Sequence, residues 1–263
     1  MDLTPYSDFI VELAQRSGDL IRPYFGADDD SLDIELKANE TSLETWPSIV
    51  TRADREAEEL MRGMILKRFP EHGIVGEEYG EERPGAEFVW TLDPIDGTIS
   101  FASANPQFGT IIALLHNGEP VLGVIHQPVL RQLCLGDGAT TTLNGKPVRS
   151  RNLRPLSEAT LLVTDLRFHE GSAWESLRRE VNLVRTWGDC YGYLLVATGH
   201  ADIMSDPGMC LWDIAPLVPV VRGAGGVITD WQGNDAMGMK STLATSSQAL
   251  HDEVIRRLNT KTL

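Results

Sequence analysis

The stretch Phe88-Val-Trp-Thr-Leu-Asp-Pro-Ile-Asp-Gly-Thr98 runs from apolar residues into two carboxylates that lie three positions apart. Its first six residues are typical of a buried strand, and we expect the strand to end at Asp93 and a loop to follow. Mg2+ prefers oxygen ligands, often one or two carboxylates together with water and substrate phosphate. Asp93 and Asp96 can supply such ligands, with the carbonyl of Ile95 between them. The stretch therefore suggests a cation site.

The end of this stretch is suited to binding an anion. The amides of Gly97 and Thr98 can point at a phosphate if a helix or turn begins there. Taken alone, the stretch fits a plain turn equally well, because Asp-Pro and Asp-Gly are common turn pairs. Three further acids favour a site: Glu77 follows an apolar step, and Asp54 and Asp213 stand at expected helix starts. A buried acid in such a position needs a partner.

Helical and strand-like patterns are mixed along the chain. We expect helices over 7–25, 51–69, 172–181, 189–199 and 213–223, a last helix from Ser246 or Ser247 to about 258, strands over 88–93, 161–164, 201–205 and 225–230, and a β-meander over 108–148. Pro219 should kink its helix. The polar stretch 26–47 is expected to be a mobile loop or weak hairpin, with Lys37 as its only basic residue.

This order of elements predicts an α/β (α+β) fold of layered sheets and helices. We expect a single domain over 1–263, built from two intimate halves of about 1–150 and 151–263. No internal repeat or clear linker interrupts the chain.

The composition excludes several function classes. The chain has 263 residues, with 23 Lys and Arg against 38 Asp and Glu, which gives a net charge of −15. This charge argues against nucleic-acid binding, which depends on cationic side chains. No apolar run approaches the ~20 residues of a membrane helix. The acidic N-terminus is unlike a signal peptide, and the three cysteines form no disulfide framework, so we expect a cytoplasmic protein.

Other catalytic motifs are missing from the sequence. The six histidines show no metal-ligand spacing, and no Gly-x-Ser-x-Gly elbow marks a serine hydrolase. The glycine-rich run Gly223-Ala-Gly-Gly226 precedes an expected strand instead of opening a helix, so it is a poor dinucleotide loop.

Four segments together resemble the inositol monophosphatase family of Mg2+-dependent, lithium-sensitive sugar phosphatases. They are Val50-Thr-Arg-Ala-Asp54, Gly76-Glu-Glu78, Asp93 to Thr98 with Phe101, and Trp212-Asp213 followed by the glycine-rich run at 223–226. They occur in the family's order, and the resemblance spans about residues 7 to 258. It implies a layered αβαβα sandwich and, because family members commonly pair, a homodimer.

The resemblance also implies a metal site with two or three Mg2+ ions. Glu77, Asp93, Asp96 and the Ile95 carbonyl would bind the first ion, and Asp93, Asp96 and Asp213 would bind a second. Two such cations stabilise both the attacking and the leaving oxygen of an in-line displacement.

The phosphate and the nucleophile have implied positions as well. Gly97 and Thr98 would bind the phosphate. Asp54 and Thr98, together with Glu77, would orient and activate a metal-bound water. No phosphoenzyme is expected, because water is the nucleophile.

Within the family, Gly188-Asp-Cys-Tyr-Gly-Tyr193 is most similar to histidinol-phosphate phosphatases. A carboxylate at Asp189 suits a cationic substrate, although the helix dipole alone also favours an acid there. Asp206 matches a position that contacts the alcohol part of the substrate. Arg185 would help shape this pocket, unless it forms a structural ion pair, and Asp213 would also face the substrate.

The predicted function is hydrolysis of L-histidinol phosphate to L-histidinol and phosphate, in histidine biosynthesis. The alternative substrate is inositol 1-phosphate or another small phosphate ester. A different class is a regulatory protein of the same fold that binds a partner. All the expected metal carboxylates are present, which favours an enzyme. The expected partners are a phosphate-ester substrate and a second copy of the chain, without nucleic acid or membrane.

Overall fold

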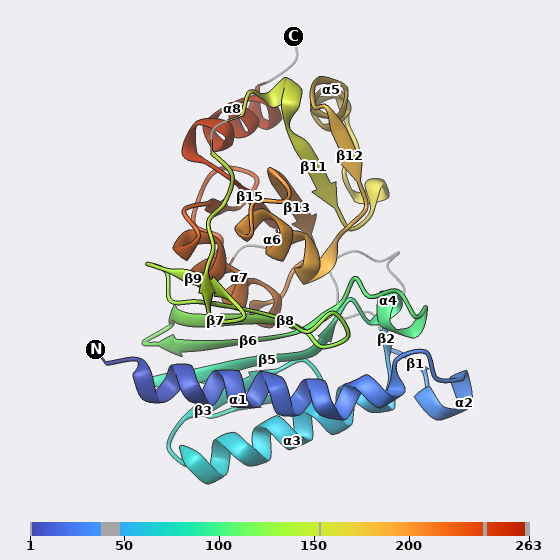
Figure 1. Cartoon of the computed structure of the whole chain (residues 1–263), viewed down its shortest axis with the longest axis vertical. Helices are drawn as coiled ribbons and strands as arrows, with labels where there is room; N and C mark the ends of the chain where they lie inside the picture. The colour runs from blue at the N-terminus through green and yellow to red at the C-terminus, as the bar shows by residue number, and fades with distance from the viewer. Residues whose placement is uncertain (1, 38–47, 153, 239–240, 261–263) are drawn as a thin grey trace.

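The computed structural model describes residues 2–37, 48–152, 154–238 and 241–260. Within these ranges the elements form five layers, in the order helices, sheet, helices, sheet, helices (Figure 1). The helices of the three layers are α1 (Thr4–Ile21) with α3 (Arg52–Arg68), α6 (Asp189–Ala197) with α7 (Leu211–Gly223), and α5 (Ser172–Glu180) with α8 (Gln248–Asn259). The predicted αβαβα sandwich is confirmed.

The larger sheet contains the expected meander. Its strands are β3 (Gly73–Gly76), β4 (Gly80–Glu82), β5 (Phe88–Asp96), β6 (Gly109–His116), β7 (Glu119–Gln127), β8 (Gln132–Gly136), β9 (Thr141–Leu143) and β10 (Lys146–Pro147). They lie in the order β10-β9-β8-β7-β6-β5-β3-β4. Only β3 and β5 pair in parallel; the other neighbours are antiparallel.

The smaller sheet belongs to the second half of the chain. Its strands are β11 (Thr160–Val163), β12 (Leu183–Arg185), β13 (Ile203–Pro207), β14 (Val227–Thr229) and β15 (Ser241–Thr245), in the order β12-β11-β13-β15-β14. The strand β11 pairs in parallel with both β12 and β13. Parallel pairing brings the carboxyl ends of these strands to one edge of the sheet, and β11 points that end toward the larger sheet (Figure 1).

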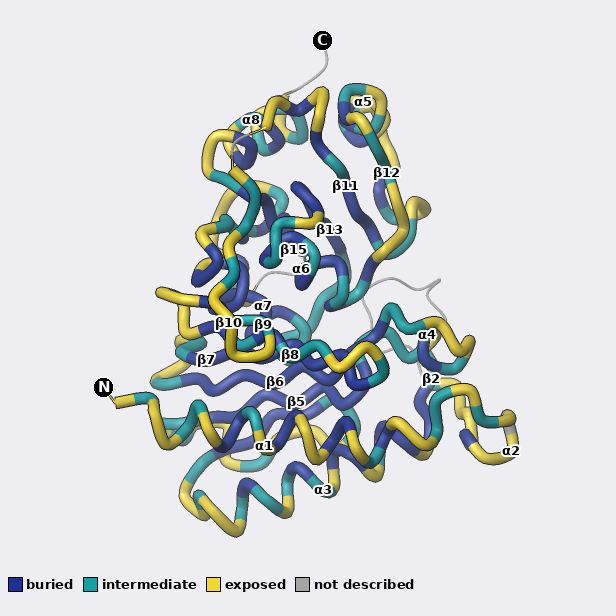
Figure 2. The backbone as a smooth tube through the Cα atoms, in the orientation of Figure 1, coloured by how far each residue is buried: buried dark blue, intermediate teal, exposed yellow. Residues whose placement is uncertain are grey.

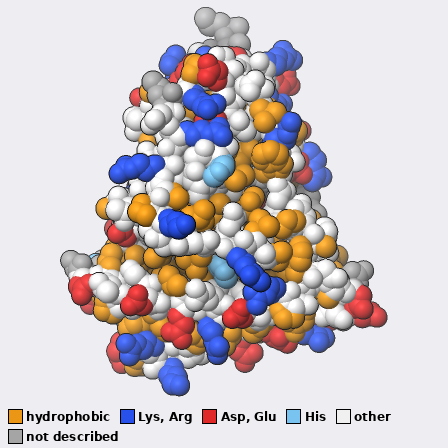
Figure 3. Space-filling view, in the orientation of Figure 1, with side chains coloured by type: hydrophobic (Ala, Val, Ile, Leu, Met, Phe, Trp, Pro, Cys, Tyr) orange, Lys and Arg blue, Asp and Glu red, His pale blue; other side chains and the backbone are white. Residues whose placement is uncertain are grey.

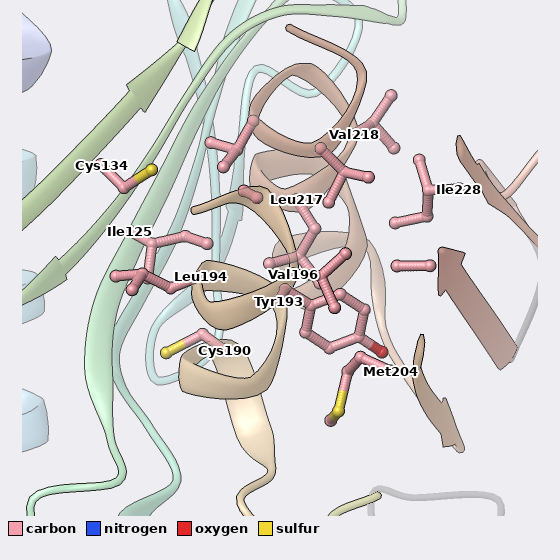
Figure 4. Close-up of a cluster of buried hydrophobic side chains, with 14 of the residues drawn as sticks. Ile125, Cys134, Cys190, Tyr193, Leu194, Val196, Met204, Leu217, Val218 and Ile228 are labelled. Atoms are coloured by element: carbon pink, nitrogen blue, oxygen red, sulfur yellow. The ribbon is translucent and has the colours of Figure 1, made fainter. Parts of the chain in front are cut away.

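Both halves of the molecule have a buried interior (Figure 2), and most of its side chains are apolar. Helix α1 buries Ile10 and Leu13 against α3 and the larger sheet, which explains its helical apolar spacing. The central helices α6 and α7 fill the space between the sheets, where Leu194 and Leu217 contact residues of β7 and β14 (Figure 4). The visible surface carries acidic and basic side chains among hydrophobic ones (Figure 3).

Helix α7 packs tightly on the larger sheet. It continues through Pro216 and Pro219 to Gly223, and both prolines are buried. A β-carbon at Gly123 or Gly136 would overlap the carbonyl oxygens of these two prolines. The two glycines therefore allow the helix backbone to approach β7 and β8 directly.

One strand ends later than the sequence predicts. Strand β5 continues to Asp96 instead of ending at Asp93, with an irregular register against β6 between these two acids. The Thr110 hydroxyl donates to the Pro94 carbonyl at 2.8 Å, which keeps this proline within the sheet. The weak hairpin expected in the polar stretch is present in part, since β1 (Glu35–Leu36) pairs antiparallel with β2 (Ile49–Val50). Residues 38–47 lie outside the described residues.

Several short elements complete the described chain. They are α2 (Asp29–Leu32), α4 (Thr98–Ala102), η1 (Arg22–Tyr24), η2 (Leu156–Glu158) and η3 (Leu166–Phe168). Among the described helices, none is both long and apolar enough to cross a membrane.

Candidate active site

A cavity of about 520 Å³ lies where the carboxyl ends of β5, β11 and β13 meet the starts of α4, α6 and α7. Most of the predicted site residues line it: Glu77, Asp93, Ile95, Asp96, Gly97, Thr98, Asp189, Asp206 and Asp213. We call the side formed by Glu77, Asp93, Asp96 and Asp213 the metal wall. The side formed by Thr164, Asp189 and Asp206 is the alcohol wall.

Three acids of the metal wall converge. Asp93, Asp96 and Asp213 each offer an oxygen within 4.8 Å of the other two, the distance range over which a shared cation can be held. Burial raises the pKa of Asp93 and of Asp213 well above the usual range, and neighbouring carboxylates raise each pKa further. Burial also raises the pKa of Asp96 to about 6. A hard oxygen donor set with this surplus of negative charge fits a divalent cation such as Mg2+.

A backbone amide orients each of these three acids. The amide of Ile95 donates to Asp93 Oδ1 at 3.0 Å, and the amide of Cys190 donates to Asp96 Oδ2. Asp213 occupies the first turn of α7 and accepts from the Cys210 amide at 2.6 Å, in a capping box. The helix dipole favours a carboxylate there.

Asp54 lies buried behind the metal wall, at the corresponding position of α3. Its Oδ2 accepts from the Thr51 amide at 2.8 Å and from the Thr51 hydroxyl at 2.5 Å. Burial raises the pKa of Asp54 to about 7. The Thr98 hydroxyl lies 3.4 Å from Asp54 Oδ1 and 3.0 Å from the Ile95 carbonyl oxygen, so Thr98 links Asp54 to the segment 93–98.

Gly97 and Thr98 lie at the start of α4. Gly97 has φ +88° and Thr98 is the first residue of the helix. The positive φ is a conformation that only glycine adopts without strain. The expected helix or turn therefore begins where the anion-binding amides were predicted.

Glu77 stands on the turn between β3 and β4 and is held by a lysine. Lys37 Nζ lies 2.8 Å from Glu77 Oε1 and 2.6 Å from Glu78 Oε1. Burial alone would lower the pKa of Lys37, but the two carboxylates outweigh it and raise the pKa above its usual value. In the sequence, Lys37 stands out as the single basic residue of the acidic stretch 26–47.

Thr164 joins the two acids of the alcohol wall. Its hydroxyl accepts from the Asp189 amide at 2.7 Å, and its own amide donates to Asp206 Oδ1 at 3.0 Å. Asp189 has φ +50°, a strained conformation for an aspartate, at the first residue of α6. Tyr193 Oη also donates to Asp206, at 3.4 Å.

The pKa values of both acids of the alcohol wall are raised. Burial raises the pKa of Asp189 well above the usual range, and the nearby Asp96, Asp206 and Asp213 raise it further. Burial raises the pKa of Asp206 to about 7. The largest causes of both shifts include no lysine or arginine. The alcohol wall is thus acidic, and Arg167, which also lines the cavity, is paired with Asp165.

Arg185 is not brought to the cavity. It is exposed, donates to the Val184 carbonyl at 2.8 Å and lies over the Trp187 ring. The sequence reasoning missed Thr164 and Arg167, both of which line the cavity. Arg167 is paired with Asp165 at 2.6 Å. Thr164 lay within an expected strand, but the parallel register that sets it beside Asp206 has no local signal in the sequence.

Comparisons with known proteins agree on one family. A family model described as the inositol monophosphatase family matches residues 2–263. A histidinol-phosphatase from Chlorobaculum parvum is 36% identical over 258 residues, which cover 96% of each chain. A chloroplastic bifunctional phosphatase from Arabidopsis thaliana is 40% identical over 241 residues, covering 89% of this chain and 67% of that one.

The fold is also similar to that of a solved inositol monophosphatase. The solved structure of an inositol monophosphatase from Zymomonas mobilis superposes with a TM-score of 0.84 at 33% identity, covering 99% of this chain and 100% of the other.

Proposed function

The chain belongs to the inositol monophosphatase family and is a phosphoric monoester hydrolase, and from this premise we propose that it hydrolyses L-histidinol phosphate with Mg2+ as its cofactor. The family is metal-dependent, and the acids of the metal wall fit a divalent cation. Glu77, Asp93, Asp96, Asp213 and the Ile95 carbonyl would hold two or three Mg2+ ions. When bound, Mg2+ supplies positive charge to the phosphate oxygens and lowers the pKa of a water.

The chain's own residues would place the phosphate and the water. The amides of Gly97 and Thr98 at the start of α4 would receive the phosphate oxygens. Asp54 takes both Thr51 donors on Oδ2, which directs Oδ1 toward the Thr98 hydroxyl. We assign Asp54 and Thr98, with Glu77, to orienting the attacking water and accepting its proton.

One observation favours a cationic substrate: Asp189 and Asp206 are acids in excess of what the phosphate chemistry needs. Asp165 is already paired with Arg167, and Glu77 with Lys37. The donors to these two carboxylates are neutral: the Thr164 amide and the Tyr193 hydroxyl for Asp206, and the Ser100 side chain for Asp189. Histidinol phosphate carries an ammonium and an imidazole that would offset this charge, whereas inositol phosphate offers only hydroxyls.

The location of the site also supports the expectation that the two halves of the chain form one domain. Asp213 is carried by α7, which belongs to the second half of the chain but packs on β6 and β7 of the first. We propose that the two halves act as one domain and that each is needed to complete the metal wall.

The test compares phosphate release from L-histidinol phosphate and from inositol 1-phosphate, each with Mg2+ and with EDTA. We expect a Mg2+-dependent preference for histidinol phosphate. Release that persists in EDTA would contradict the metal assignment. Preference for inositol phosphate, or equal rates, would keep the metal wall and overturn the substrate.

A further inference from the structure

We propose that the buried Glu58 and the partly buried Arg62 of α3 form a clamp that positions the turn bearing Glu77 for cation binding. Glu58 is then a positioning residue, acting through Glu77 without touching the cation. The inference rests on the proposed role of Glu77 as a metal ligand. It concerns the backbone of the 77–80 turn, whichever phosphate ester the enzyme takes.

The contacts of Glu58 all lead to this turn. Its side chain is fully buried. Oε2 accepts from the Glu78 amide at 2.7 Å, and Oε1 accepts from the Tyr79 amide at 3.1 Å. These two amides belong to the residues that directly follow Glu77, so the carboxylate fixes the path of the chain at the ligand.

Arg62 completes the clamp from one helical turn further on. Its Nε donates to Glu58 Oε1 at 2.7 Å, and its Nη2 donates to the Gly80 carbonyl. One guanidinium thus holds both the carboxylate and the first residue of β4. The planar fork of arginine allows two such bonds at a fixed angle, which a lysine ammonium cannot reproduce.

A second feature shows that the approach of Glu58 is built into the strand before the turn. A β-carbon at Gly76 would overlap Glu58 Oε1. The residue before Glu77 is therefore one that leaves room for the carboxylate.

Packing alone is a weak explanation for this clamp. Burying a carboxylate costs free energy of desolvation, and an apolar pair of similar volume is often as stable or more stable. A charged clamp gives something that an apolar pair cannot, because it binds two amides and a carbonyl in one geometry. Among the described residues, the Lys37 ammonium pairs with the side chains of Glu77 and Glu78, so it does not replace this restraint on the backbone.

The test measures Mn2+ binding to the metal-free full-length chain, by the electron paramagnetic resonance signal of free Mn2+. It also measures the KM for the phosphate ester at saturating Mg2+. We expect Glu58→Gln to weaken Mn2+ binding about 10- to 100-fold, the usual range when a residue that orients a ligand is changed. Its KM should change less than about threefold. Arg62→Lys, a milder change, should weaken Mn2+ binding by a smaller factor in the same direction.

Asp202→Asn is the matched control. Asp202 is also fully buried, pairs with Arg151 at 2.9 Å and accepts from the Thr160 amide at 2.8 Å, but it lies in the other half of the chain. This variant should lose thermal stability and keep wild-type Mn2+ binding.

Wild-type Mn2+ binding in both Glu58→Gln and Arg62→Lys would overturn the clamp, as would equal weakening in Asp202→Asn. Glu77→Gln separates this failure from that of the proposed function. If Glu77→Gln binds Mn2+ as the wild type does, the assigned ligand set is wrong and the clamp falls with it. If Glu77→Gln weakens binding and Glu58→Gln does not, only the clamp is overturned.

Discussion

On the metal wall, Asp93 and Asp213 accept hydrogen bonds from backbone amides two or three positions away. Both acids of the alcohol wall are instead hydrogen-bonded to Thr164, which lies 25 positions from Asp189 and 42 from Asp206. Asp96 also depends on tertiary structure, because its amide donor is Cys190 at the start of α6. Asp93 and Asp213, two of the four acids of the metal wall, are thus oriented by local motifs, whereas both acids of the alcohol wall are oriented by tertiary structure.

The comparison suggests how one fold serves different substrates. A capping box or an Asp-Pro-Ile-Asp segment orients its acid through bonds within a few residues. Such local motifs therefore preserve the phosphate chemistry in any chain that adopts this fold. An alcohol wall assembled across strands can be altered by changes in the register or in a single joining residue. We therefore expect damage to the metal wall to affect every substrate, and damage to the alcohol wall to affect only some.

The largest expected effect tests the metal wall. Asp96→Asn removes one charge from the converging acids, and we expect kcat/KM to fall about 1,000-fold, or about 4 kcal/mol, for every phosphate ester. Steady-state phosphate release from histidinol phosphate and inositol 1-phosphate measures this. A loss confined to one substrate would contradict the assignment of Asp96 to the metal wall.

Asp189→Asn tests the alcohol wall at its acid. We expect kcat/KM for histidinol phosphate to fall about 30- to 100-fold, since a hydrogen bond to a charged group contributes about 1.5–3 kcal/mol. Inositol 1-phosphate should change less than about threefold. Equal losses for the two substrates would break the comparison.

Arg185→Ala supplies the control for this variant. Arg185 was predicted from the sequence to shape the pocket, but its side chain lies over Trp187 outside the cavity. We expect both substrates to keep their rates within about threefold.

Acid should loosen the support of the alcohol wall through His169. This buried ring contacts the Asp165 carbonyl at 3.0 Å and the hydroxyl of Ser205, the residue before Asp206, at 3.4 Å. Burial lowers the pKa of His169 to about 4. The unfolded chain binds the proton near pH 6.5, so the contribution of His169 to stability is complete above that pH and is lost as pH falls toward 4.

Urea unfolding of the metal-free protein checks this at pH 7.5 and pH 4.5. The stability advantage of the wild type over His169→Gln should shrink by about 2–3 kcal/mol at the lower pH. An advantage that stays constant between the two values would show that His169 does not titrate in this range.

The smallest effect is expected at the residue that joins the alcohol wall. Thr164→Val removes the acceptor of the Asp189 amide and leaves the Thr164 amide on Asp206. We expect kcat/KM for histidinol phosphate to fall about 10-fold, and less for inositol 1-phosphate. Thr51→Val removes a hydroxyl that donates to the Asp54 carboxylate, and it should instead lower kcat/KM for both substrates alike. The same pattern in both variants would refute the distinction between the walls.

The difference between the walls also explains what could be predicted from sequence. The helix starts near Asp54 and Asp213 were foreseen from the sequence, and in the structure each acid accepts the amide three positions before it in a capping box. The end of β5 was placed too early, because the bond from Thr110 to Pro94 comes from a neighbouring strand. Thr164 could not be found at all, since its role depends on a parallel register between β11 and β13.

The packing of α7 on the larger sheet has a practical consequence. A chain divided after Val148 would leave Asp93 and Asp96 in one fragment and Asp213 in the other. The glycines that receive α7 would remain with the first fragment, so each piece would keep half of a complementary surface. Phosphate release would then require the pieces to meet, and proteins fused to the two fragments would report their own association as an enzymatic signal.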